Sequence, residues 1–310
     1  MLSYRLFVEC IDKVVYKASS ESVYNFYLGL TRSLLALSTL LTLIFNDESV
    51  LFKSGLRSKI NNDFFFLERI NLFSLVPDGY ISLTKWIACF FLTLVVIGWR
   101  PRFTCVFHWY ISLCFLNTAL DIEGGDQIVS NISLLLIPIC LLDNRRWHWS
   151  EKETNCLTSI EVSKRIVTKL LFLLIRLQIC VIYFHSAVAK LAVPQWINGT
   201  ALYYWFNHPV FGMDQWLKPL INPLITDPFL SFLFSWLVIV IELILSASIL
   251  MSTKHYKRLW ICGTLFHFFI IIFHGLFSFF FSMTGALTAY LLVDYSNLKQ
   301  NYRRYEVVTE

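Results

Sequence analysis

The segment from Tyr183 to Lys190 places residues suited to acid–base chemistry inside an apolar run. Tyr183, Ser186 and Lys190 are spaced i, i+3 and i+7, which puts their side chains on one face of a helix. An amine that is shielded from water loses its proton more readily, so Lys190 could act as a neutral base near pH 7. Its position alone also fits a plainer interpretation, in which the side chain only extends its charge to the membrane surface.

Further side chains in or near apolar runs could act with Lys190. His185 belongs to the same segment, and Trp196 follows it closely. His267 and His274 are seven residues apart, so they share one stripe of a later helix. Such a stripe can line a polar cavity, whereas a single histidine is more often a hydrogen-bonded packing residue. We take His185 and His274 as catalytic candidates, and His267 and Trp196 as candidates for contacting a cofactor that the sequence does not identify.

A short acidic turn supplies the remaining catalytic candidates, Asp121, Glu123 and Asp126, around Gly124 and Gly125. Carboxylates this close can tune each other for acid–base work, or they can contact a cation or a cationic substrate. A solvated turn is the plain alternative. The spacing is not that of a known calcium loop, and no cluster of cysteine and histidine suggests a zinc site, so no metal is predicted.

Two more charged residues lie well inside apolar runs, where charge is costly. Arg176 precedes Lys190 by fourteen residues, and Glu242 shares a helix face with Ser235 and Ser246. The simplest expectation is a structural ion pair between Arg176 and Glu242.

The elements that must position these residues are membrane helices. Of the 310 residues, 56% are hydrophobic and only 15% are charged, whereas soluble domains carry about 25% charged residues. A spanning helix needs about 20 mostly apolar residues. The sequence therefore predicts an all-α, polytopic helix bundle that forms a single transmembrane domain over residues 1–310. The expected spans are 24–45, 84–99, 103–120, 128–142, 170–190, 229–251, 259–275 and 276–293.

The last two spans form one apolar stretch of 35 residues, from Leu259 to Val293. This stretch is too long for one ordinary span, and Gly275 near its middle predicts a tight reversal. Seven spans result if the stretch stays unbroken. The fourth span contains Pro138, which predicts a tilted or broken helix.

The distribution of basic residues predicts the orientation. With the N-terminus inside, the inner segments hold 17 Lys and Arg residues and the outer segments hold 5. The positive-inside rule therefore favours N-in, C-in. In this orientation two long loops, 46–83 and 191–228, lie on the outer side. The second loop is rich in Trp and Pro, which is typical of the membrane interface.

Two other classes of protein are disfavoured. The net charge of +5 comes from basic residues between apolar runs, where they set topology, so nucleic acid is not an expected partner. The cysteines show no C-x-x-C spacing and none falls in an outer loop, which disfavours a thiol oxidoreductase.

The stretch from Tyr183 to Leu202 resembles a motif of the HTTM family, the membrane domains that include the vitamin K-dependent gamma-glutamyl carboxylases. The matching features are Tyr-Phe at a helix end, a turn of small residues, Lys190-Leu, and then Trp196 and Gly199. The resemblance implies that Lys190 is a base that abstracts a proton.

The length, the acidic turn and the segment from His274 to Phe279 are more similar still to the bacterial SdpB branch of these proteins. That resemblance implies a multi-pass protein of the bacterial plasma membrane that matures a secreted peptide toxin of the sporulation-delaying type. Its partners would be the bilayer, the precursor peptide and a second small maturation protein. Whether the chain is an enzyme stays open, because a scaffold, an exporter component or an immunity protein would carry similar intramembrane charges.

Overall fold

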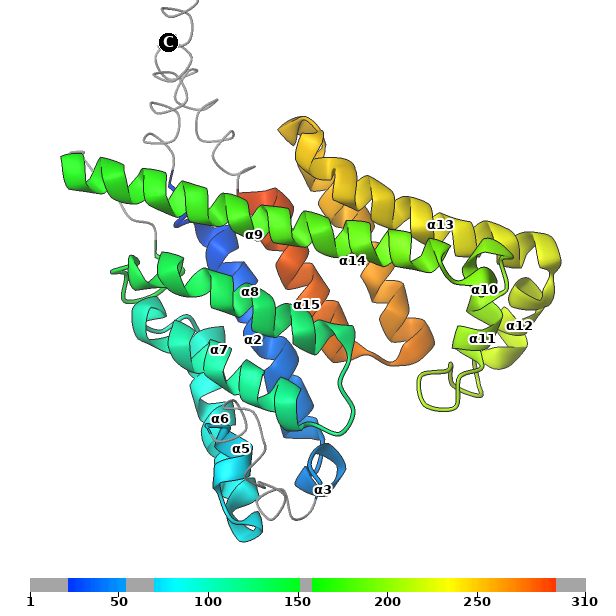
Figure 1. Ribbon diagram of the computed structural model, residues 1–310, viewed down its shortest axis with the longest axis horizontal. Coiled ribbons are helices and arrows are strands. Elements are labelled where there is room, and N and C mark those ends of the chain that lie inside the picture. The colour runs from blue at the N-terminus through cyan, green and yellow to red at the C-terminus, as the bar shows by residue number, and fades with distance from the viewer. Residues whose placement is uncertain (1–21, 54–69, 151–157, 294–310) are drawn as a thin grey trace, which may run out of the picture.

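The computed structural model describes residues 22–53, 70–150 and 158–293, and within these ranges it contains helices and no strands (Figure 1). The long helices are α2 (Phe26–Phe45), α6 (Ile81–Val96), α7 (Pro101–Thr118), α8 (Gly124–Leu141), α9 (Ser159–Leu191), α13 (Pro228–Ala247), α14 (Tyr256–His274) and α15 (Phe277–Leu287). They correspond one to one with the eight expected spans. The short helices α3 (Glu48–Leu51), α5 (Leu72–Leu75), α10 (Pro194–Ile197), α11 (Ala201–Phe206) and α12 (Lys218–Thr226) lie in the two long loops.

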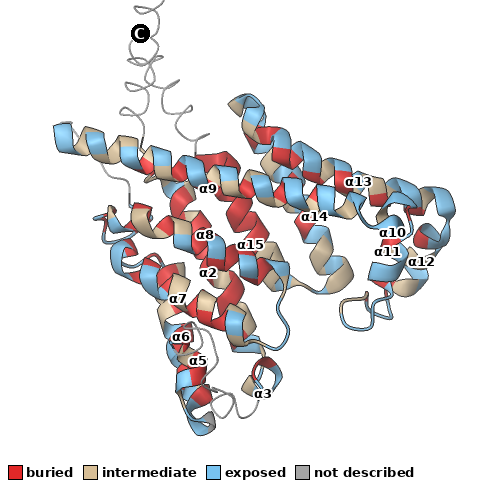
Figure 2. Ribbon diagram, viewed as in Figure 1, coloured by how far each residue is buried: buried red, intermediate tan, exposed pale blue. Residues whose placement is uncertain are grey.

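The centre of the bundle is α2, which packs against α15, α6 and α8. Close approach is possible because α15 carries Gly285 where a side chain would be 3.1 Å from Leu35 of α2. Burial follows this arrangement. In the most apolar part of α2, 61% of the residues are buried, whereas in that of α14 the share is 17%. Figure 2 shows the same contrast, with buried residues concentrated on α2 and α15.

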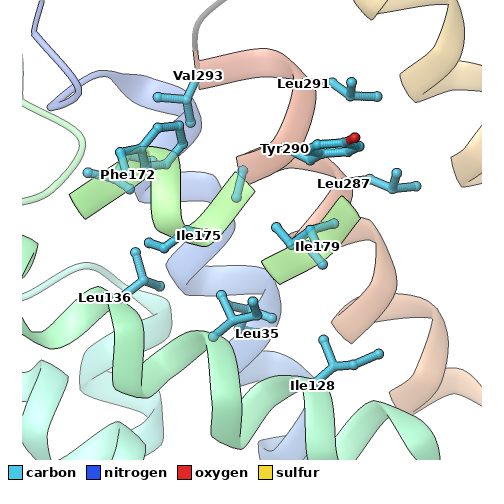
Figure 3. Packing of buried hydrophobic residues seen from close by; sticks show 14 of the residues in the cluster. Leu35, Ile128, Leu136, Phe172, Ile175, Ile179, Leu287, Tyr290, Leu291 and Val293 are labelled. Carbon is cyan, nitrogen blue, oxygen red and sulfur yellow. The ribbon is translucent and has the colours of Figure 1, made fainter. Parts of the chain in front are cut away.

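Helix α9 is 33 residues long and lies across the bundle. At 1.5 Å per residue it is about 50 Å long, longer than the ~30 Å hydrocarbon core. Helix α9 begins at Ser159, eleven residues before the expected start of the membrane span at Leu170, and Thr158 caps it by accepting from the N–H of Glu161. Its inward face inserts Phe172, Ile175 and Ile179 into the main hydrophobic cluster (Figure 3).

The predicted reversal at Gly275 is confirmed. Gly275 ends α14 with φ of 68°, a left-handed conformation that glycine adopts without strain. Helix α15 then returns along α14 and ends in a π-helical turn, Thr288–Leu292. Of the tilt or break expected at Pro138, the break does not occur, since α8 continues through Pro138 to Leu141.

Within the described part of the chain, five helices are long and apolar enough to cross a membrane: Phe26–Phe45, Gly124–Leu141, Ser159–Leu191, Pro228–Leu250 and Thr253–His274. Ile81–Val96 and Phe277–Leu292 are apolar but shorter. Large apolar side chains on the outer faces of α9 and α13 are exposed, as expected for surfaces in contact with lipid. The chain is thus a helical membrane protein, while the exact number of spans and their orientation remain predictions.

Candidate functional site: a lysine–glutamate pair between two helices

Lys190, at the end of α9, forms an ion pair with Glu242 of α13. Its Nζ lies 2.8 Å from Oε2 and 2.8 Å from Oε1 of Glu242, and also donates to the hydroxyl of Ser186 at 2.8 Å. The hydroxyl of Ser186 in turn donates to Oε1 of Glu242 at 2.9 Å. The two charged side chains are 18% and 9% accessible, so the pair is shielded but not sealed.

The expected ion pair between Arg176 and Glu242 is wrong. The polar stripe of α13 faces α9 with Glu242 opposite Lys190, and one turn further Ser246 bonds to the backbone of Cys180. Arg176 lies more than three turns before Lys190, where it donates to the carbonyl of Tyr290 at 3.1 Å and the hydroxyl of Tyr256 at 2.8 Å. The Ser-Glu-Ser stripe was visible in the sequence, but its partner helix was not.

Trp196 lies over the pair, with Nζ of Lys190 5.3 Å from the centroid of its ring. The position of α10 is fixed by Gly199, whose carbonyl accepts from the hydroxyls of Ser231 and Ser235 on α13. Gly199 has φ of 77°, and a side chain there would be 2.3 Å from Cα of Phe232. The sequence pattern Lys-x5-Trp-x2-Gly thus has a physical basis, because the glycine permits the contact that holds the tryptophan over the lysine.

Two turns before Lys190 on the same face, the hydroxyl of Tyr183 lies 2.9 Å from Nε2 of His267. His267 is 2% exposed, and its Nδ1 has no partner among the described residues. His274, on the same stripe of α14, instead donates from Nδ1 to the carbonyl of Phe211 at 2.5 Å. This bond ties the loop after α11 to the reversal at Gly275.

Two residues of the Tyr183–Lys190 segment do not join this site. His185 and Phe184 are exposed on the outward face of α9, because each is displaced by about 100° per residue from the face of Tyr183 and Lys190. Phe184 is 54% exposed.

The acidic turn forms a separate cluster at the start of α8. The backbone N–H of Glu123 donates to Oδ2 of Asp126 at 3.0 Å, and the hydroxyl of Ser278 donates to Oε1 of Glu123. Burial raises the pKa of Glu123 to about 7. Asp121 is exposed and forms no ion pair with a described residue. The first turn of α15 separates this cluster from the histidine stripe, since Ser278 contacts Glu123 while the ring of Phe279 packs 5.7 Å from that of His267.

A third polar cluster was missed by the sequence analysis. Arg32 of α2 is 2% exposed and donates to Nδ1 of His148 at 2.9 Å and to the hydroxyl of Thr104 at 3.0 Å. His148 fits against Gly98, where a side chain would be 2.3 Å from its ring. Burial, and then the charges of Arg32 and Arg145, lower the pKa of His148 to about 2. The signal was a charged residue in the first apolar run together with a glycine at the end of the second.

The Lys190–Glu242 pair offers an amine, a carboxylate and a hydroxyl within one hydrogen-bonded group. Transfer of a proton from the Lys190 ammonium to the Glu242 carboxylate would leave a free amine beside a carboxylic acid. No group of three or more His, Cys, Asp or Glu side chains that could hold a metal occurs among residues 22–53, 70–150 and 158–293.

Comparison with known proteins shows the family. The chain is 38% identical over 274 residues to the sporulation-delaying protein SdpB of Bacillus subtilis (strain 168), a match that covers 88% of this chain and 83% of SdpB. It is also 34% identical over 305 residues to the uncharacterized protein YitO of the same organism, covering 96% and 95% of the two chains. No protein-family model matches the chain, and no solved structure matches it. At this identity and coverage, the chain belongs to the family of the sporulation-delaying protein SdpB.

Proposed function

We propose that this protein acts in the production of a sporulation-delaying peptide toxin in the bacterial plasma membrane, and that Lys190 and Glu242 form its working site. The relationship to SdpB supports the biological role. The observation that supports the site is the pair itself: a lysine and a glutamate, 2.8 Å apart, bonded to a serine and covered by a tryptophan.

In the mechanism that we propose, Lys190 is an HTTM-type base. Binding of the precursor peptide beneath Trp196 excludes the remaining water from a pair that is already 18% and 9% accessible. In a less polar surrounding the neutral amine and carboxylic acid become more favourable than the two charges. The proton of Lys190 then moves to Glu242, and the free amine removes a proton from the substrate. Ser186 keeps the amine oriented during this exchange.

Substitution Lys190→Arg tests the base. Arginine can still pair with Glu242, but it does not lose its proton at physiological pH. We expect the Lys190→Arg protein to be folded and inserted in the membrane. The strain that carries it should release no active toxin. His185→Ala is the matched control, because His185 lies on the same helix but on its exposed outward face, and this variant should release normal amounts.

Toxin release at the wild-type level by Lys190→Arg, at equal protein abundance, would contradict the base mechanism. Position 190 would then need only a long cation. The protein would act as a non-catalytic scaffold, exporter component or immunity protein that binds the peptide. Mass spectrometry separates the two functions, because an enzyme leaves covalently altered peptide and a scaffold leaves the peptide mass unchanged.

We further propose that the site opens to the outer face of the membrane. Support comes from the excess of basic residues in the segments at the opposite ends of the helices. Reporter fusions at Gly212 and at Lys257 test this orientation. We expect the first to be exported and the second to be cytoplasmic, and the reverse pattern would place the site on the inner face.

A further inference from the structure

The chain between α9 and α13 begins with a long stretch that carries no charged side chain. No Asp, Glu, Lys or Arg occurs from Leu191 to Met213, and the polar side chains there are amides, hydroxyls, indoles and one histidine. Exposed apolar or aromatic side chains lie on and beside α10 and α11: Val193, Ile197, Tyr203, Tyr204 and Trp205. An uncharged surface of this kind is typical of a region that contacts lipid and not water.

The Lys190–Glu242 pair lies far from the end of α13. Glu242 is fourteen residues after Pro228, the first residue of α13, which is about 21 Å along the helix axis. The hydrocarbon core of a bilayer is about 30 Å thick, so a span that begins at Pro228 carries Glu242 near to the middle of the membrane. Helices α10 and α11 pack against α13 (Figure 1). The segment that contains them therefore accompanies α13 from the pair towards its outer end.

The backbone of this segment is hydrogen-bonded by side chains of α13. The chain between α10 and α11 is not helical, and an unpaired carbonyl in hydrocarbon is costly. The carbonyl of Gly199 accepts from the hydroxyls of Ser231 at 2.6 Å and Ser235 at 3.2 Å. The carbonyl of Ile197 accepts from the indole N–H of Trp236 at 3.3 Å. The turn between the two short helices thus has protein partners where a loop in water would use the solvent.

We propose that residues 192–206 form a re-entrant segment inside the bilayer, and that the Lys190–Glu242 pair receives its substrate from the lipid beside this segment and not from water. The inference rests on the proposed function of the pair and names its substrate class, a peptide that is already held in the membrane by apolar side chains. A route without water also suits the proton transfer, because it favours the neutral forms of the pair. Exposed apolar side chains of the segment and of the neighbouring turn of α13 would contact the peptide: Val193, Ile197, Phe232 and Leu233.

Two carbodiimides that differ in solubility test the direction of access. The full chain is placed in phospholipid nanodiscs and treated with dicyclohexylcarbodiimide, which dissolves in lipid, or with a charged, water-soluble carbodiimide. The lipid-soluble reagent should modify Glu242 at least about tenfold faster, because the charged reagent does not enter the apolar layer. Mass spectrometry detects the product as an adduct or as an amide between Glu242 and Lys190. Asp214, an exposed acid outside the segment, is the internal control and should react with the water-soluble reagent.

Faster or equal modification of Glu242 by the water-soluble reagent would overturn the lipid route, and so would the absence of modification by both reagents. Cysteine labelling is the second measurement. In the same nanodiscs a charged maleimide should label Ile197→Cys at least about tenfold more slowly than Asp214→Cys, with the wild-type chain as the background for the native cysteines. Equal rates would place the segment in water.

These measurements do not depend on toxin release, so they separate the two proposals. If Lys190→Arg still supports release while Ile197→Cys is protected, the base mechanism is wrong and the re-entrant segment stands. If Lys190→Arg abolishes release while Ile197→Cys reacts as fast as Asp214→Cys, the base mechanism stands and the substrate comes from water.

Discussion

The clusters around Lys190 and around Arg32 both place a basic side chain between membrane helices, but they differ in partner and access. Lys190 faces a carboxylate and keeps 18% of its side chain accessible. Arg32 donates to two neutral groups, His148 and Thr104, and is 2% exposed. In the mechanism proposed above, the accessible pair exchanges a proton with the substrate, whereas the buried Arg32 holds helices together. Intramembrane charge alone therefore does not identify a functional site.

We expect the largest loss of stability from a substitution that disturbs the packing of the buried cluster of Arg32 and His148. In Gly98→Ala the new methyl group would meet the ring of His148 at 2.3 Å, and φ of 86° is unfavourable for alanine. We expect a loss of about 3–5 kcal/mol, which leaves little folded protein. The measurement is the yield of monodisperse protein in detergent. Gly79→Ala, where nothing lies within 4 Å, is the control and should purify normally.

Acid should also act on the buried cluster. Because the pKa of His148 falls from 6.5 to about 2 on folding, its contribution to stability is complete above pH 6.5 and is lost as the pH falls towards 2. Between pH 6.5 and pH 5 we expect a loss of about 2 kcal/mol. Melting temperatures across this range should fall steeply in the wild type and less steeply in His148→Asn. Equal slopes would contradict the buried neutral imidazole.

At the Lys190–Glu242 pair we expect a small loss of stability and a large loss of toxin production. Glu242→Gln keeps the shape and the hydrogen bond to Ser186 but removes the charge opposite Lys190, so we expect a loss of only about 1–2 kcal/mol. Toxin production should nevertheless fall to the level of Lys190→Arg, since a glutamine cannot take the proton. The stability is measured on the purified variant, and toxin production is measured in the strain that expresses it. A variant that is folded and fully active would remove Glu242 from the mechanism.

The smallest effect is expected on the outward face of α9. His185→Ala changes an exposed side chain, so the free energy of unfolding should change by less than about 0.5 kcal/mol. Toxin production should stay at the wild-type level. A strong loss of production with normal folding would mean that a partner approaches this face, and the contrast between the two clusters would then be incomplete.

The number and approximate positions of the long helices follow from local features of the sequence. Apolar runs of about 20 residues predicted all eight, and Gly275 predicted the reversal, because these features depend on local composition and on backbone conformation. The i, i+3, i+7 spacing also placed Tyr183, Ser186 and Lys190 on one face correctly. The first eleven residues of α9 lie outside the expected span, since seven of them are polar or charged.

Which helix faces meet depends on how the helices pack in three dimensions. Helical periodicity gives the direction of a side chain around its own axis, but it carries no information about the neighbouring helix. Glu242 could therefore be paired with Arg176 on paper, while the antiparallel packing of α9 and α13 brings it to Lys190. The same limit hid His148, which lies in a loop and reaches Arg32 across 116 residues of sequence. Contacts between distant segments depend on how the whole bundle packs, which local spacing in the sequence does not specify.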